Sequence, residues 1–324
     1  MITLGFEGTA HTLGVGVIDD DFRVLADVKK VYTPAGGGIH PREAAQHMSE
    51  HLREAVCEAL VGGKVSWSDV GLIVFSQGPG MGPCLRTVAT AARVLALYHK
   101  KPVLGVNHCI AHIEVGRVFN KLENPLTLYV SGANSQVIAL SEGRYRVFGE
   151  TLDVGVGNML DKFGREVGLA HPAGPKIEAL AREGKKYIKL PYVVKGTDLS
   201  FSGLLTSALN AHKQGEPLPD VCFSLQETAF AMLTEVTERA LAHLKNREVL
   251  LTGGVAANRR LQEMVELMAA EHDASFAVPK GFTGDNGVMI AVLGKRMHDA
   301  GARMRIEETV VLPKQRTDDV EVVW

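Results

Sequence analysis

The sequence predicts an α/β protein made of two similar halves. Short apolar segments alternate with glycine-rich turns and amphipathic stretches along the chain, which is typical of α/β folds. Residues 2–18 read as an apolar strand, a turn of small residues and a second apolar strand, and residues 126–140 repeat that form. With 324 residues, of which 46% are hydrophobic and 22% charged, the chain is long enough for two lobes.

The first half continues from its opening hairpin into a helix, a buried strand and a second helix. The first helix is predicted because Ala44, Met48 and Val56 belong to one apolar stripe of helical period. The elements expected in this half are an irregular loop over 33–40, a helix over 41–60, a strand over 71–75, a helix over 87–98 and a strand over 102–106.

The segment after the strand over 102–106 reads NHCIAHIE and suggests a metal site. His108 and His112 are four residues apart, so a helix would place both imidazoles on one face. Two neutral imidazoles so placed can bind one transition-metal ion from the same side. Histidines at this spacing are also common as an ordinary core or surface pair, so the prediction needs further ligands from elsewhere in the chain.

The second half predicts a duplicated fold. Each half of the chain begins with a strand–turn–strand hairpin. This arrangement is typical of ATPases of the actin, hexokinase and Hsp70 type, in which the tips of the two hairpins hold the nucleotide phosphates between them. The elements expected later are an irregular stretch over 191–222, a helix over 224–244, a strand, glycine turn and helix that include Asn258, and a helix capped by Asp285 and Asn286. For Asp285, a simple capping role is the interpretation that the local pattern supports.

Composition limits the class of protein. The formal charge of −2 and the pI of about 6.6 give no electrostatic case for strong nucleic-acid binding by the isolated chain. The four cysteines are far apart and form no CxxC pair, which favours a reducing compartment. No apolar run approaches the roughly 20 residues that cross a bilayer. We therefore expect a cytoplasmic protein without a membrane partner.

Ten motifs together resemble the universal TsaD/Kae family, in its archaeal and eukaryotic branch. They cover nearly the whole chain in family order, and read GFEGTAHTLGVG, GGIHPREAAQH, FSQGPGMGPCLRTVATAAR, GVNHCIAH, LYVSGANSQV, FGETLDVGVGNMLDKF, LPYVVKGTDLSFSGLLT, SLQETAFAML, LTGGVAANRRL and DNGVMIA. The resemblance implies a tRNA-modifying enzyme, which transfers threonylcarbamoyl from threonylcarbamoyl-AMP to N6 of adenosine 37 in tRNAs that read ANN codons.

The same resemblance implies a duplicated actin-like ATPase (ASKHA) fold, with nucleotide and metal in the cleft between the lobes. We expect lobes 1–120 and 121–324, partly interleaved, with a helical insertion near 160–245. The cofactors implied are one Fe or Zn ion and ATP, ADP or threonylcarbamoyl-AMP. The partners implied are tRNA and the KEOPS subunits, namely a small atypical kinase, a small dimerising subunit and a further regulatory subunit.

Site residues follow from the matching motifs. By resemblance, the metal ligands would be His108, His112, Tyr129 and Asp285. The phosphate and carbamoyl end of the adenylate would lie along Tyr129, Val130, Ser131, Gly132 and Ala133, and the ribose and adenine would be held by Asp161, Gly174, Glu178 and Asn258. The chain departs from the family in having Ala133 and Ala173 where glycines are usual, and alanine replaces glycine well only where φ is negative.

The attacking adenine amine must lose a proton. Glu7 and His11, at the tip of the first hairpin, are the candidates for handling it, although a structural role for Glu7 is equally compatible with the sequence. Three other functions remain alternatives. A nucleotide-binding scaffold that regulates an attached kinase is one. A sugar or acetate kinase of the same fold is another, and the metal-ligand set argues against it. A metalloprotease is disfavoured, because no HExxH motif surrounds His108 and His112.

Overall fold

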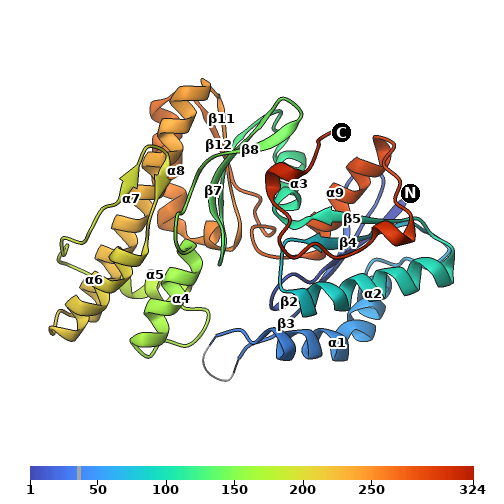
Figure 1. Cartoon of the computed structure of the whole chain (residues 1–324), viewed down its shortest axis with the longest axis horizontal. Coiled ribbons are helices and arrows are strands. Elements are labelled where there is room, and N and C mark those ends of the chain that lie inside the picture. The colour runs from blue at the N-terminus through green and yellow to red at the C-terminus, as the bar shows by residue number, and fades with distance from the viewer. Residues whose placement is uncertain (35–37) are drawn as a thin grey trace. The chain divides into compact units, whose positions relative to one another are not determined.

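Two compact units make up the protein. The structure, a computed structural model, describes residues 1–34 and 38–324 (Figure 1). The first unit comprises Met1–Phe119, Glu142–Tyr145 and Asp285–Trp324, and the second comprises Asn120–Ser141 and Arg146–Gly284. Residues 35–37, at the centre of the predicted loop over 33–40, lie outside the described residues.

The C-terminal segment belongs to the first unit. The sequence prediction gave lobes 1–120 and 121–324, partly interleaved, and in the structure Asp285–Trp324 joins the unit formed by the N-terminal residues. The reason is packing: helix α9 (Gly287–Asp299) lies on strands of the first sheet. The segment after α9 is hydrogen-bonded to strand β4 (Val70–Gly78), since the Leu312 N–H donates to the Gln77 carbonyl at 2.8 Å.

The first unit is built on a five-stranded sheet in the order β3-β2-β1-β4-β5. The antiparallel strands come first and the parallel strands second, because β1 pairs antiparallel with β2 and parallel with β4. The elements of this unit besides β4 and α9 are β1 (Ile2–Glu7), β2 (Thr12–Ile18), β3 (Val24–Val31), α1 (Pro41–Gly62), α2 (Gly82–His99), β5 (Val103–Asn107) and α3 (His108–Asn120), followed after α9 by short 3-10 turns at Ile306–Glu308 and Thr317–Asp319.

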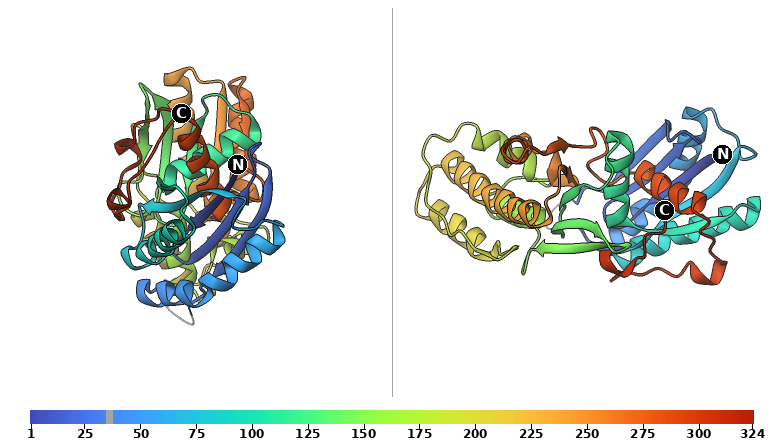
Figure 2. Two further views of the ribbon diagram at one scale, coloured as in Figure 1. Left: turned by 90° about the vertical axis from the view of Figure 1, so that its right-hand side faces the viewer. Right: turned by 90° about the horizontal axis from the view of Figure 1, so that it is seen from above.

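Opposite faces of this sheet are covered by different helices (Figures 1 and 2). Leu4, Phe6 and Val15 point to the face covered by α1 and α2 and form the core there. The alternate positions on β1 and β2 include Gly5, Gly14 and Gly16, and α9 lies on these three glycines. A Cβ on Gly16 would lie 2.2 Å from the Val288 nitrogen. This close approach brings Asp285 to the ends of β1 and β2.

The second unit has an equivalent sheet. Its strand order is β12-β11-β6-β7-β8, in which β6 pairs antiparallel with β7 and parallel with β11. This is the order and direction of the first sheet, which confirms the predicted duplication. Its elements are β6 (Leu126–Val130), β7 (Ser135–Ser141), β8 (Arg144–Glu150), α4 (Val156–Glu166), α5 (Gly174–Ala181), β9 (Val194–Lys195), β10 (Asp198–Leu199), α6 (Ser202–Lys213), α7 (Leu218–Leu244), β11 (Glu248–Thr252), a 3-10 turn (Gly254–Ala257), α8 (Arg259–Glu271) and β12 (Ser275–Ala277). The first two residues of β8, Arg144 and Tyr145, are counted with the first unit.

One region is more regular than its sequence indicated. Residues 191–222 were expected to be irregular, but they contain α6 and the first turn of α7. Helix α6 buries Leu204, Leu205 and Ala208 on one side. This apolar stripe is too short to be recognised from the sequence alone. Among the described residues, no helix is both long enough and apolar enough to cross a lipid bilayer.

Candidate metal centre and nucleotide-contact residues

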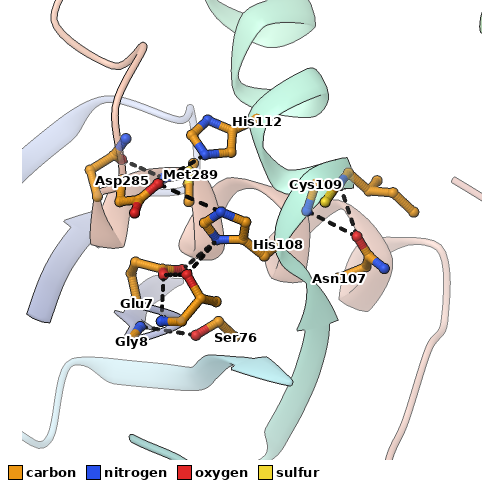
Figure 3. A network of polar contacts seen from close by, with 12 residues as sticks. Glu7, Gly8, Ser76, Asn107, His108, Cys109, His112, Asp285 and Met289 are labelled. Carbon is orange, nitrogen blue, oxygen red and sulfur yellow. Dashed lines mark hydrogen bonds and ion pairs between the residues drawn. The ribbon is translucent and has the colours of Figure 1, made fainter. Parts of the chain in front are cut away.

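The metal-binding motif begins where a strand of the first sheet becomes a helix. Strand β5 ends at Asn107 and α3 starts at His108. The Asn107 side chain caps the helix, because its Oδ1 accepts hydrogen bonds from the N–H groups of Cys109 at 2.9 Å and Ile110 at 3.1 Å (Figure 3). Its amide nitrogen donates to the Arg316 carbonyl at 3.2 Å. Asn107 therefore fixes the turn of chain that presents His108.

His108, His112 and Asp285 converge in the first unit (Figure 3). The Asp285 Oδ1 lies 3.2 Å from the His112 Nε2 and 3.6 Å from the His108 Nε2. The two rings are nearly perpendicular, with centroids 4.8 Å apart. Both histidines are buried, and Asp285 is partly exposed. Three of the four predicted ligands thus face one another.

These three side chains fit a transition metal. All three donor atoms lie within 4.8 Å of one another. Ligands about 2.0–2.2 Å from a tetrahedral zinc ion are separated by roughly 3.3–3.6 Å, close to the two distances from Asp285. Two imidazoles and one carboxylate are the donor set of catalytic zinc and of mononuclear Fe(II) sites, both of which keep positions open for substrate.

Glu7 holds His108 in place. It is fully buried at the end of β1, and its Oε2 lies 3.0 Å from the His108 Nδ1. Its other oxygen accepts hydrogen bonds from the Thr9 N–H at 2.8 Å and the Thr9 hydroxyl at 2.6 Å. A proton on Nδ1 satisfies the contact with Glu7 and leaves Nε2 as the lone-pair donor, which is the carboxylate–histidine arrangement common around metals. This geometry favours the structural alternative for Glu7 over proton transfer.

The electrostatics of the group favour a bound cation. Burial opposes a charge on His108, but the carboxylates of Glu7 and Asp285 outweigh it and raise the pKa of His108 to about 9. Burial lowers the pKa of His112, which keeps that imidazole neutral. Burial opposes ionisation of Asp285, but its hydrogen bond with His112 and the nearby His108 charge lower its pKa. Two carboxylates around two imidazoles therefore attract positive charge to this point.

The capping alternative for Asp285 is wrong. The N-cap of α9 is the next residue, Asn286, whose Oδ1 accepts from the Met289 N–H at 2.8 Å. Asp285 stands one residue before the cap and turns its carboxylate toward the histidines. His11 lies at the tip of the β1–β2 hairpin, near enough for its charge to help lower the pKa of Asp285. Its predicted role in proton transfer stays a prediction.

Tyr129 belongs to the second unit. It is fully buried in β6, where it pairs with Gln136 of β7 and Thr252 of β11. Its predicted place as a fourth ligand stays a prediction.

The turn after β6 is fitted closely to the start of α4. The Gly157 N–H donates to the Ser131 carbonyl at 3.1 Å, and the Asn158 N–H donates to the Gly132 carbonyl at 2.9 Å.

Ala133 and Ala173 do not have positive φ, so both alanines fit where the family usually has glycine. The N–H groups of Gly132 and Ala133 make no hydrogen bond within the described residues, and both residues are exposed. They can therefore donate to an anion.

The four residues predicted to hold ribose and adenine lie on segments of the second unit that are linked by hydrogen bonds. Asp161 on α4 accepts from the Ala173 N–H at 2.8 Å, next to Gly174 at the start of α5. Glu178 on α5 accepts from the Arg259 N–H at 3.2 Å. That nitrogen follows Asn258, which caps α8 by accepting from the N–H groups of residues 260 and 261. The structure thus brings the starts of α5 and α8 next to Asp161 and Glu178, and the roles of the four residues in holding the nucleotide stay a prediction.

Sequence reasoning missed several residues that complete these sites. Asn107 could have been recognised, since asparagine directly before a helical motif is a frequent N-cap. Ser76, whose hydroxyl accepts from the Gly8 N–H at 3.0 Å, carried no local signal. Gln226 also carried none, although its Oε1 accepts from the Asn258 amide at 3.0 Å. Partners so distant in sequence meet only through the tertiary fold.

Known proteins resemble this chain closely in sequence. A family model described as TsaD: tRNA N6-adenosine threonylcarbamoyltransferase matches residues 23–292. A tRNA N6-adenosine threonylcarbamoyltransferase of Thermococcus sibiricus is 58% identical over 326 residues, covering all of both chains. A probable bifunctional tRNA threonylcarbamoyladenosine biosynthesis protein of Methanobrevibacter smithii is 56% identical over 325 residues, and this chain spans 60% of its length.

Solved structures resemble it in fold. The T. kodakarensis HypF structure matches with a TM-score of 0.67 at 16% identity, over 95% of this chain and 49% of that one. Component A of the (R)-2-hydroxyglutaryl-CoA dehydratase of Acidaminococcus fermentans matches with a TM-score of 0.58 at 12% identity, over 90% and 97%. These likenesses support the duplicated actin-like ATPase fold. From the family match and the close relatives, the chain belongs to the TsaD family of tRNA N6-adenosine threonylcarbamoyltransferases.

Proposed function

We propose that this chain transfers a threonylcarbamoyl group from threonylcarbamoyl-AMP to N6 of adenosine 37 in tRNAs that read ANN codons, with a metal ion held by His108, His112 and Asp285. The observation that carries the proposal is the convergence of these three side chains in a chain that matches the family model over 23–292. We expect Tyr129 to supply a fourth ligand, and the reaction to take place in the cytoplasm, where tRNA is modified.

In this reaction the protein mainly has to position the two substrates, because the threonylcarbamoyl donor is already chemically activated. The donor is a mixed carbamic–phosphoric anhydride. The N6 amine attacks the carbamoyl carbon, and the bond from that carbon to the phosphate oxygen breaks. AMP leaves, and N6 loses one proton. A bound Fe or Zn ion would supply a Lewis acid that polarises the carbamoyl carbonyl. Glu7 would keep the His108 Nε2 aimed at this point by holding its Nδ1.

The second unit supplies groups suited to the adenylate. The N–H groups of Gly132 and Ala133, two exposed residues, suit the phosphate that departs with AMP. Asp161 and Glu178 carry acceptor oxygens that suit ribose hydroxyls, but each already accepts a backbone N–H. In our proposal they accept the nucleotide with their remaining lone pairs. Their first task is structural: Asp161 links α4 to the start of α5, and Glu178 links α5 to the start of α8.

We also propose that the chain works with protein partners of the KEOPS type, which include a small atypical kinase and a small dimerising subunit. Supporting this, the relative from M. smithii is named as bifunctional and extends beyond the part matched by this chain. With a net charge of −2, the isolated chain is expected to bind tRNA weakly, so partners would supply part of the basic surface.

The double substitution His108→Ala/His112→Ala tests the proposal. We expect metal content, measured by elemental analysis, to fall below about one tenth of the parent, and single-turnover transfer from supplied threonylcarbamoyl-AMP to tRNA to fall at least about 1000-fold. Far-UV circular dichroism should be unchanged. The matched control is His47→Ala/His51→Ala on α1, the same spacing on another helix. Transfer at the parental rate in the first variant would refute the proposal and favour the scaffold that regulates a kinase.

A further inference from the structure

A buried ionic cluster lies on α3 beyond the metal-binding motif. Glu114 is fully buried, and no part of the proposed reaction uses it. Its Oε1 accepts from the Arg117 guanidinium at 2.9 Å and from the Tyr145 hydroxyl, and its Oε2 accepts from the Arg296 guanidinium. Arg117 also donates to the Tyr145 hydroxyl at 2.9 Å. All four residues belong to the first unit.

The cluster joins the two segments that carry the metal ligands. Glu114 and Arg117 belong to α3, which begins with His108. Arg296 belongs to α9, which begins two residues after Asp285. One segment of chain, from Asp285 to Arg296, therefore contacts α3 at two places: its start faces the two imidazoles, and the third turn of α9 binds Glu114.

The two contacts lie on opposite sides of α3. His112 and Glu114 are two residues apart, which is about 200° around a helix. Asp285 meets one side and Arg296 meets the other, so a rotation of α3 about its axis would break at least one of the contacts. On α9, Asn286 and Arg296 are ten residues apart, or about 15 Å along the axis, which also restricts tilting of one helix against the other.

The cluster carries one more positive charge than negative charge, so it can lose one arginine without leaving its carboxylate unpaired. One carboxylate faces two guanidinium groups, while the Tyr145 hydroxyl stays protonated, because burial and then the Glu114 charge raise its pKa. Removing either arginine leaves one carboxylate with one guanidinium. Neither change strands a buried charge, which is the usual reason that substitutions in such clusters unfold a protein.

We propose that Glu114 is a positioning residue for the metal centre: by binding Arg296 it ties the far side of α3 to α9, and so fixes the direction in which His108 and His112 point toward Asp285. This inference depends on the metal site proposed above. It predicts that the link from Glu114 to α9, and not the net charge of the cluster, sets the metal affinity.

Two matched substitutions separate these effects. Arg296→Met cuts the link between α3 and α9, whereas Arg117→Met removes the same kind of group from the same carboxylate but leaves Arg296 in place. We expect Arg296→Met to weaken Zn²⁺ binding at least tenfold, within the range of about 10–100-fold seen when outer-shell partners are lost, and Arg117→Met to change it less than threefold. Affinity is measured on the full chain by competition with a chromophoric chelator, with Fe²⁺ as a second probe.

Thermal unfolding of the metal-free variants provides the control for a merely structural role. We expect similar midpoints for the two variants, so that a difference in Zn²⁺ affinity reports position and not global stability. The pair Arg296→Gln and Arg117→Gln repeats the comparison if either methionine variant fails to fold. Equal affinities in the matched pair would overturn the inference. A parent chain that binds neither Zn²⁺ nor Fe²⁺ would instead remove the proposed metal site, and the inference with it.

Discussion

In the first unit, His108, His112 and Asp285 turn their donor atoms toward one another. In the second unit, Asp161 and Asn258 instead accept hydrogen bonds from backbone N–H groups at the starts of helices. The first arrangement is a site whose polar atoms are directed at a common point. The second is a scaffold whose polar atoms stabilise helix starts. Residues that match a family motif equally well can thus differ in their roles. Their contacts in the structure distinguish these roles, whereas the sequence motifs alone do not.

Among the substitutions that test this difference between the two units, Glu7→Gln is expected to have the largest effect, and the quantity affected is metal affinity. The amide keeps the shape of the side chain but loses the charge that holds the His108 Nδ1 proton, so we expect metal affinity to fall about 10–100-fold. Transfer measured with saturating metal should recover most of the parental rate. Affinity is measured by chelator competition, and Thr9→Val, which removes one hydroxyl from the same carboxylate, should have a smaller effect. Unchanged affinity with a lost rate would instead indicate that Glu7 handles the proton.

A smaller effect is expected from Asn258→Ala. Loss of the cap of α8 costs about 1 kcal/mol and lowers the thermal midpoint by roughly 2–4 °C. Asn258→Ser keeps a capping oxygen and should stay close to the parent. If Asn258 acts as scaffold, ADP affinity measured by calorimetry should follow the same order, with serine near the parent and alanine weaker. Equal loss of ADP binding in both variants would show that the amide contacts the nucleotide and would break the contrast between the units.

The smallest effect concerns acid stability of the second unit. Burial opposes ionisation of Asp153, but hydrogen bonds from Ser202, Phe201 and Val154 outweigh it and lower its pKa to about 2. A lowered carboxylate pKa means stability that is present above the unfolded value near 4 and is lost as the pH falls toward 2. Because the residue is exposed, water screens the effect to less than about 1 kcal/mol.

Asp153→Asn checks the sign of this effect. Between pH 2 and pH 5, the thermal midpoint of the variant should rise less steeply with pH than that of the parent. The two midpoints should differ most at the upper end of that interval. A parallel pair of curves would mean that the carboxylate does not stabilise the start of α6.

Much of the fold could be predicted from local patterns. The helix over 41–60 and the strand over 71–75 were found because an apolar stripe and an apolar run are local signals. The duplication was also predicted, since each half opens with the same strand–turn–strand form. Helix α6 was missed, because its stripe is short and its start is held by Asp153, some 50 residues earlier.

The sequence by itself determined that the His108 and His112 imidazoles lie side by side on one helix face. Spacing of four on a helix places His108 and His112 on one face whatever surrounds them, and the matching motifs added Asp285 to the set. The tertiary structure decided the rest: Asp285 arrives only because glycines on β1 and β2 let α9 approach the sheet backbone, and Glu7, Asn107 and Arg296 reach α3 from distant parts of the chain. Helical period acts over a few residues, whereas burial and hydrogen bonding act between whichever residues the fold brings together.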